Sequence, residues 1–247
     1  MMKRSVNAIL SQIGYEIRRI QIREESPGFV LHRYLNSDGS FDCEKYRKIQ
    51  EDGNKRKINK VWVNEENVAF LSNYIKSLIP SPQFGICHGT RRGKEQEWFR
   101  KYLSCEVIGT EISDTAENFP YTIQLDFHEV KPEWIDSVDF IYSNSFDHSY
   151  DPEKCLNAWM SCLRKGGLCI IEHSSFHEPG YASELDPFGA EISLMIYLTT
   201  IWGKGKYGVR QLLTAPNISN SVSYLHFIVI QRFCVNSGVK RGQSPVQ

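Results

Sequence analysis

The chain has 247 residues, 41% of them hydrophobic, and its 29 basic side chains balance 29 acidic ones. This length and composition predict a globular protein built as one α/β domain with an extension, or as one domain plus a small one. The balanced charge and the lack of interleaved basic and aromatic residues argue against nucleic acid as a partner.

The apolar runs and the cysteines argue against a membrane-spanning or secreted protein. No apolar stretch approaches the roughly 20 residues that cross a bilayer, and the N-terminus is too polar for a secretory signal. The seven cysteines are scattered without a C-x-x-C pair, so the common zinc and redox motifs are absent from the sequence. Their odd number and apolar neighbours indicate buried, reduced thiols, and we expect a cytoplasmic protein.

The first 80 residues are expected to be mostly helical. Residues 5–22 carry apolar side chains at helical spacing with arginine and lysine on the flanks, which predicts a basic amphipathic helix. Such a helix packs on the protein's own body or on a partner; the alternative is peripheral contact with a membrane surface. Residues 24–59 are polar and turn-rich, with 45–60 partly helical, and residues 64–79 resume helical spacing until Pro80-Ser81-Pro82 stop it.

From residue 82 onward strands alternate with helices, which predicts a doubly wound, mostly parallel sheet. The expected strands span 83–87, 105–110, 121–126, 138–143 and 167–172, and the expected helices span 93–103 and 152–164, with a short one near 132–135. Two late strands, 207–214 and 224–233, would add an antiparallel pair at one edge. We therefore expect a helical region over 1–80, a second domain over 81–235 and a flexible tail over 236–247.

Polar and acidic residues follow all five parallel strands, where ligands of open α/β sheets bind. The first strand leads into a turn bounded by Gly89 and Gly93, and the second ends on Glu111. Glycines let backbone approach a ligand closely, and an acid on the neighbouring strand can accept hydrogen bonds from both hydroxyls of a ribose. The order strand, glycine turn, helix, strand and acid predicts a nucleoside pocket.

The segment from about residue 82 to 173 resembles a class I S-adenosylmethionine-dependent methyltransferase. The resemblance rests on Gly89-Thr90-Arg91-Arg92-Gly93, on Glu111, on Leu125-Asp126-Phe127, on Asp139-Phe140-Ile141-Tyr142-Ser143-Asn144-Ser145, and on Leu163-Arg164-Lys165-Gly166-Gly167 before an apolar run. It implies a Rossmann-like methyltransferase fold with seven strands in the order 3-2-1-4-5-7-6. It covers roughly 90 residues, and the order of the motifs is more specific than any one of them.

The resemblance implies S-adenosyl-L-methionine as cofactor. Glu111 would accept from the ribose, Asp126 from the adenine amine, and Ile112 with Phe127 would form an apolar slot. Three departures from the family pattern are the G-x-x-x-G spacing of the turn, His88 at a position often held by glycine, and Lys165 in place of a proline. Charge complementarity assigns Arg91 to the methionine carboxylate. The full predicted cofactor set is His88, Gly89, Arg91, Gly93, Glu111, Ile112, Asp126, Phe127, Ser143 and Asn144.

The methyl acceptor is expected to be a small molecule or a carbohydrate that is methylated on oxygen. The loop 174–187 and the segment 188–208 would shape its pocket. A hydroxyl acceptor needs a base, and His148 after the fourth strand is the candidate, with Asp147 to orient it or to bind a metal. The carbohydrate hypothesis rests on similarity to sugar-modifying methyltransferases that also begin with a basic amphipathic helix.

Alternatives remain open from the sequence. A short-chain oxidoreductase that uses NAD(P) would share the Gly89–Gly93 spacing, and a Tyr150-x3-Lys154 pair mimics its catalytic residues. A non-catalytic scaffold would use residues 5–22 to join a membrane-associated partner. His173 and His177 could bind a metal with Asp147 or Glu172, although we assign no metal. Each of these residues could instead have a structural role. Gly89 and Gly93 could only permit a tight connection, and Asp126 or His148 could cap a turn or a helix.

Overall fold

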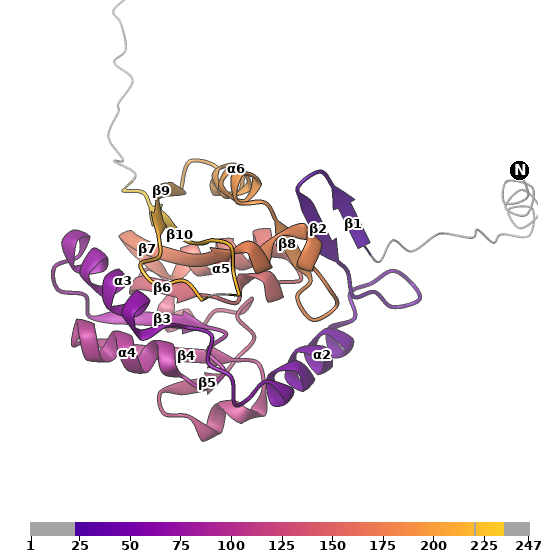
Figure 1. Ribbon diagram of the computed structural model, residues 1–247, viewed down its shortest axis with the longest axis horizontal. Coiled ribbons are helices and arrows are strands. Elements are labelled where there is room, and N and C mark those ends of the chain that lie inside the picture. The colour runs from indigo at the N-terminus through magenta and orange to yellow at the C-terminus, as the bar shows by residue number, and fades with distance from the viewer. Residues whose placement is uncertain (1–22, 220, 235–247) are drawn as a thin grey trace, which may run out of the picture.

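The computed structural model describes residues 23–219 and 221–234 (Figure 1). The predicted helix over 5–22 and the predicted tail over 236–247 lie outside these residues. No helix in the described ranges is long and apolar enough to cross a membrane.

A seven-stranded sheet forms the centre of the described structure. Its strands are β3 (Phe84–His88), β4 (Glu106–Glu111), β5 (Thr122–Gln124), β6 (Val138–Ser143), β7 (Leu163–Ser174), β9 (Tyr207–Thr214) and β10 (Leu225–Arg232). They lie in the order β5-β4-β3-β6-β7-β10-β9. The first five are parallel, and β10 runs antiparallel to both β7 and β9. This order confirms the predicted 3-2-1-4-5-7-6 arrangement and the mostly parallel α/β fold.

Helices cover both faces of this sheet. The α-helices are α2 (Cys43–Arg56), α3 (Glu65–Leu78), α4 (Lys94–Leu103), α5 (Pro152–Cys162) and α6 (Ile192–Gly203). Short 3-10 helices are η1 (Asp114–Asn118), η2 (Pro132–Trp134), η3 (Phe146–His148), η4 (Ser175–His177) and η5 (Pro179–Tyr181). Buried side chains of α3 and α4 pack with one set of strand residues, and those of α5 and α6 pack with the other.

Alternation along each strand produces these two cores, because successive side chains of a strand point to opposite faces. In β6, Ile141 joins the α5–α6 core while Phe140 and Tyr142 join the α3–α4 core. All three side chains are at most 1% exposed. Strands buried on both faces are typical of a parallel sheet that is covered by helices.

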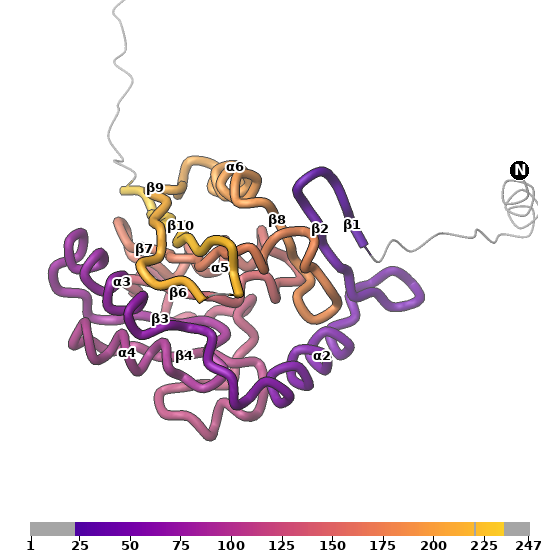
Figure 2. The backbone as a smooth tube through the Cα atoms, viewed as in Figure 1, coloured from indigo at the N-terminus to yellow at the C-terminus, as the bar shows by residue number. Residues whose placement is uncertain are grey.

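A second, small sheet joins the start of the described chain to a segment far along it. Strand β1 (Arg23–Ser26) pairs with β2 (Phe29–His32), and β2 pairs with β8 (Phe188–Ala190), both antiparallel. These three strands were not predicted from the sequence, which indicated a mostly helical region before residue 80. Figure 2 shows the chain passing from β2 to α2, and the β2–β8 pairing attaches residues 29–31 to a segment that follows the main parallel strands. The domain boundary at residue 80 stays a prediction.

Candidate functional site

The turn after β3 takes three residues into left-handed backbone conformation: Gly89 and Gly93 at φ +72° and Arg91 at φ +42°. A Cβ on Gly89 would lie 2.6 Å from the Cβ of Ser145, so the turn can pass this close only with glycine there. The backbone N–H groups of Gly89 and Thr90 both donate to the carbonyl of Thr110, at 2.9 and 3.1 Å. The unusual G-x-x-x-G spacing therefore corresponds to a tight turn that β4 holds in place.

Glu111 ends β4 and faces this turn. Its Oε2 accepts from the backbone N–H of Arg91 and its Oε1 from that of Ser113, each at 3.1 Å. The residue is 6% exposed. Burial raises the pKa of Glu111, and the two backbone N–H groups act in the opposite direction. A carboxylate oxygen has two acceptor sites, so each oxygen can still accept from a ligand hydroxyl.

Asp126 follows β5, and its carboxylate is held by His128. Its Oδ1 accepts from the backbone N–H of His128 at 2.9 Å and lies 2.7 Å from Nδ1 of the same residue. Burial opposes ionisation of Asp126, but these His128 contacts outweigh it and keep the pKa of the carboxyl below its usual value. Because both contacts use Oδ1, Oδ2 is left to accept from a ligand amine.

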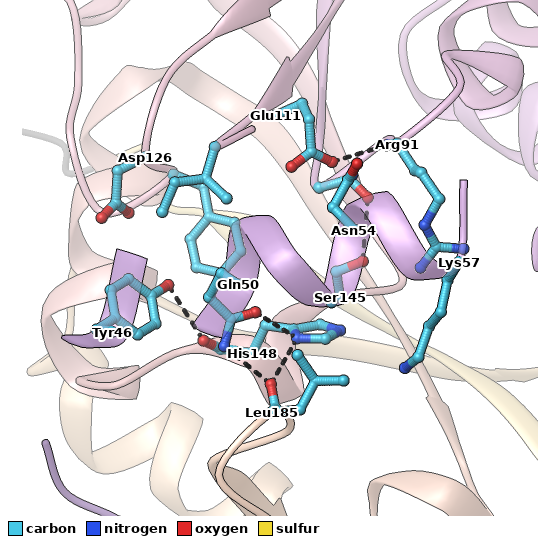
Figure 3. Close-up of a pocket in the computed structure, with 14 residues that line it drawn as sticks. Tyr46, Gln50, Asn54, Lys57, Arg91, Glu111, Asp126, Ser145, His148 and Leu185 are labelled. Atoms are coloured by element: carbon cyan, nitrogen blue, oxygen red, sulfur yellow. Dashed lines mark hydrogen bonds between the residues drawn. The ribbon is translucent and has the colours of Figure 1, made fainter. Parts of the chain in front are cut away.

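Glu111 and Asp126 border one cavity, together with Gly89, Ile112, Phe127 and His148 (Figure 3). Another wall is formed by helix α2, through Tyr46, Gln50, Gly53 and Asn54, and by its C-cap residue Lys57. The cavity measures about 50 Å³, much less than the roughly 300–1,000 Å³ of small-molecule sites. The cavity as it stands is therefore smaller than a typical nucleoside site, and α2 is the one wall that the main sheet does not build.

The contribution of α2 to the cavity was not predicted from the sequence, although one residue of the helix is a signal for it. Gly53 lies inside the helix, where glycine costs about 1 kcal/mol relative to alanine. A Cβ at Gly53 would lie 2.3 Å from Cδ1 of Leu185. The glycine thus permits close contact between α2 and the loop that contains Leu185.

Three of the predicted cofactor residues, His88, Ser143 and Gly93, do not line this cavity. His88 is 2% exposed, its Nδ1 is 2.8 Å from Oγ1 of Thr110, and its ring stacks on Trp159 at 4.6 Å. Burial lowers the pKa of His88 to about 3, so the ring is neutral. Ser143 donates to the carbonyl of His88 at 3.0 Å, and Gly93 is the N-cap of α4. In the structure these residues support the turn.

A second cavity, of about 610 Å³, adjoins the first. Lys57, Arg91, Ser145 and His148 border both. One of its walls is aromatic, with Trp62, Phe176 and Tyr181; the ring of Phe176 lies 6.5 Å from that of Trp62 and 5.1 Å from that of Tyr181. Polar residues complete it, among them Asn64, Asn144, Asp147, Glu172, Ser174, His177, Asp186 and Asn217. The loop 174–187 thus borders this cavity, while most of the segment 188–208 forms β8 and α6 elsewhere.

His148 lies where the two cavities meet. Its Nδ1 is 2.9 Å from the carbonyl oxygen of Leu185 and 2.9 Å from Oε1 of Gln50. A carbonyl can only accept, so Nδ1 carries the proton and Nε2 has the free lone pair. The nearest carboxylate to Nε2 is Asp186, with Oδ1 at 3.5 Å.

The neighbouring residue Asp147 faces another histidine. Its Oδ1 lies 3.8 Å from Nε2 of His177. Nδ1 of His177 accepts from the backbone N–H of Ser174 at 2.8 Å, so in the neutral ring the proton is on Nε2. The two histidines at this cavity therefore hold opposite tautomers, His148 able to accept at Nε2 and His177 able to donate.

The described residues contain one grouping that could hold a metal ion. Single ligand atoms of Asp147, His148 and Asp186 lie within 4.8 Å of one another. Of the alternative metal ligands His173 and His177, His173 has other partners. Its Nε2 is 2.9 Å from the carbonyl of Ala190, and its Nδ1 is 3.3 Å from the hydroxyl of Tyr224. Glu172 accepts from the hydroxyl of Tyr142 at 2.7 Å.

Comparison with known proteins defines the class of this fold. Residues 86–171 match the family model of a methyltransferase domain. This match confirms the resemblance to class I S-adenosylmethionine-dependent methyltransferases for that part of the chain. No curated protein matches the sequence.

Solved structures share the fold at low sequence identity. The Burkholderia thailandensis 1,6-didemethyltoxoflavin-N1-methyltransferase has a TM-score of 0.59 and 10% identity, over 86% of this chain and 99% of that one. The plantazolicin methyltransferase BpumL has a TM-score of 0.57 and 15% identity, over 77% and 94%. A complex of the Trm112 methyltransferase activator with a methyltransferase, from Haloferax volcanii, contains a chain with a TM-score of 0.55 and 14% identity, over 78% and 99%. Residues 86–171 therefore match a methyltransferase domain, and the described chain shares the fold of these solved methyltransferases.

Proposed function

We propose that the protein is an S-adenosylmethionine-dependent methyltransferase that methylates an oxygen of a small molecule or a carbohydrate. The observation that carries this proposal is the junction of two cavities at His148 and Arg91, one bordered by Glu111 and Asp126 and the other by polar and aromatic side chains. A donor site and an acceptor site that meet at one point are what an in-line group transfer requires.

The residues of the first cavity fit the cofactor. Asp126 Oδ2 can accept from the adenine amine, Glu111 from the ribose hydroxyls, and Ile112 with Phe127 offer apolar contact to the ring. Nε of Arg91 is buried without a hydrogen-bond partner in the described structure, which suits a carboxylate ligand. Two of the similar structures are complexes with S-adenosylhomocysteine, which supports the same choice. When bound, the cofactor supplies an already activated methyl group.

The chain's own task at the second cavity is to deprotonate and orient the acceptor. Nε2 of His148 can take a proton from an acceptor hydroxyl, since Nδ1 already holds one. Asp186 at 3.5 Å would stabilise the imidazolium that results. The amides, serines and aromatic wall of this cavity support a polyhydroxylated acceptor, because they offer many neutral hydrogen-bonding groups beside flat apolar faces.

Isothermal titration calorimetry with S-adenosylhomocysteine tests the proposal directly. We expect one site per chain, and no change in NADH fluorescence when the same protein is added. Binding of NADH without S-adenosylhomocysteine would favour the oxidoreductase. Binding of neither, with liposome binding that depends on residues 1–23, would favour the non-catalytic scaffold.

A further inference from the structure

A buried glutamine on α2 reaches the candidate base from nearly 100 residues away. Gln50 is 6% exposed. Its Nε2 donates to the carbonyl of Leu185 at 2.9 Å, and its Oε1 lies 2.9 Å from Nδ1 of His148. Because only the NH₂ end of an amide can face a carbonyl, the contact with Leu185 fixes Oε1 toward His148. Figure 3 shows the three groups meeting at one point.

We propose that Gln50 is a positioning residue for His148, which holds the ring with its proton on Nδ1 and its lone pair on the acceptor side. The inference rests on the proposed function, in which His148 Nε2 acts as base. A neutral imidazole exchanges between two tautomers, and the hydrogen bond at one nitrogen decides which form persists. Gln50 and Leu185 both accept from Nδ1, so both favour the same form.

Leu185 alone is a weak support for the ring. It lies in the loop between η5 and β8, outside any helix or strand. Besides Gln50, its backbone is held by a bond from its N–H to Oγ of Ser183 at 3.2 Å. The Leu185 side chain fits against Gly53 of α2. Helix α2 therefore fixes the loop as well as the histidine, and Gln50 is the side chain that touches both.

The same helix holds His148 a second way. The hydroxyl of Tyr46 donates to the backbone carbonyl of His148 at 3.3 Å. Tyr46 and Asn54, one turn to either side of Gln50, border the first cavity. The wall of the proposed cofactor site and the support of the base are thus one helix, so a displaced α2 would deprive Nδ1 of His148 of the hydrogen-bond acceptor that Gln50 supplies.

The ring nitrogens of His148 can be observed directly by NMR in the full chain labelled with 15N-histidine. The His148→Gln spectrum identifies the signals. We expect the Nδ1–H tautomer in the wild type and a shift toward Nε2–H or tautomer exchange in Gln50→Leu, which keeps the bulk of the side chain. Gln50→Glu retains an acceptor at Nδ1 and should restore the wild-type pattern. Lys48→Leu, on the exposed face of α2, is the matched control.

A Gln50→Leu spectrum identical to the wild type would overturn the proposal. Should Gln50→Leu fail to fold, as judged by its melting curve, the spectrum of Gln50→Glu against Gln50→Lys decides, because lysine cannot accept from Nδ1. With an acceptor in hand, we expect Gln50→Leu to lower kcat about tenfold or more and to leave the KM for S-adenosylmethionine within about threefold. Failure of the proposed function would be seen separately. S-adenosylhomocysteine would not bind, while the spectra would still show the Nδ1–H tautomer in the wild type and its loss in Gln50→Leu.

Discussion

The backbone N–H of Arg91 donates to Oε2 of Glu111 at 3.1 Å, and this contact joins the turn after β3 to the acid that ends β4. Arg91 adopts φ +42°, a conformation that costs roughly 1 kcal/mol or more outside glycine. A hydrogen bond from its amide to a buried carboxylate offsets that cost. The residue proposed to bind ribose therefore also stabilises the turn that the cofactor would approach.

Replacing Glu111 by alanine should abolish measurable S-adenosylhomocysteine binding. Two hydrogen bonds to a charged acceptor at about 1.5–3 kcal/mol each correspond to a loss of at least 100-fold in affinity. Calorimetry measures the loss, and a melting curve verifies that the chain still folds. Asp114→Ala is the matched control, since Asp114 is exposed and paired with Lys55. Unchanged affinity in Glu111→Ala would remove Glu111 from the pocket.

Gly89→Ala should destabilise the protein by more than the backbone conformation alone explains. The added Cβ would meet Ser145 at 2.6 Å, whereas Gly39, at φ +88°, has nothing within 4 Å of such an atom. Both substitutions carry a left-handed strain of about 1–3 kcal/mol. The free energy of unfolding in urea should fall further for Gly89→Ala than for Gly39→Ala. Equal losses would mean that the close approach to Ser145 is easily relieved.

His148→Ala should spare cofactor binding and lower turnover by about 10²- to 10⁴-fold, the usual contribution of a general base. Asp186→Asn should have a smaller effect, because it weakens the support of the imidazolium and leaves the base in place. Both are measured as initial rates once an acceptor is known, beside calorimetry with S-adenosylhomocysteine. Full activity of His148→Ala would show that the base lies elsewhere.

Chelation separates a base from a metal ligand at the same histidine. With Nε2 of His148 acting as base, turnover should persist after treatment with EDTA and dialysis. Activity that is lost and then restored by a divalent cation would instead assign Asp147, His148 and Asp186 to a metal site. Asp186→Asn should in that case weaken the cation dependence as well.

Glu95→Gln should stabilise the protein, and increasingly so as the pH rises. Glu95 is 6% exposed in the first turn of α4, and burial raises its pKa from 4.5 to about 8. The unfolded chain ionises this group near pH 4.5 while the folded chain resists until about pH 8, so stability is lost across that window. The gain should be roughly 2–4 kcal/mol at pH 8 and small at pH 4.5, by urea unfolding. The exposed Glu97→Gln is the control, and a pH-independent difference would contradict the prediction.

The main sheet could be predicted because its signals are local. Alternating apolar residues, glycine turns and acids at strand ends mark β3 to β7, and the family resemblance then supplies the strand order. The β1–β2–β8 sheet could not be predicted in the same way. Strand β2 has only four residues, and its partner β8 lies about 160 positions further along the chain, so nothing nearby in the sequence announces the pairing.

The site residues at the strand ends could likewise be predicted, and those outside the main sheet could not. Glu111, Asp126 and His148 follow strands, and their convergence could be predicted from the sheet alone. Gln50 and Trp62 precede the sheet in a region whose placement depends on tertiary packing, so their role was not visible. His88 illustrates the opposite error, since a polar residue at a strand end can be turned inward and stack on an aromatic ring, as it does on Trp159.

The second cavity, proposed to hold the acceptor, is bordered by Trp62 from before the matched segment 86–171 and by Tyr181 and Asp186 from after it. The β2–β8 pairing ties these two flanks to each other, independently of the main sheet. The two flanks therefore form one structural unit beside the strand ends of the main sheet. A chimaera that exchanged 23–80 together with 174–190 between two such proteins would be expected to transfer acceptor preference. Exchange of either segment alone would separate β2 from its partner strand β8.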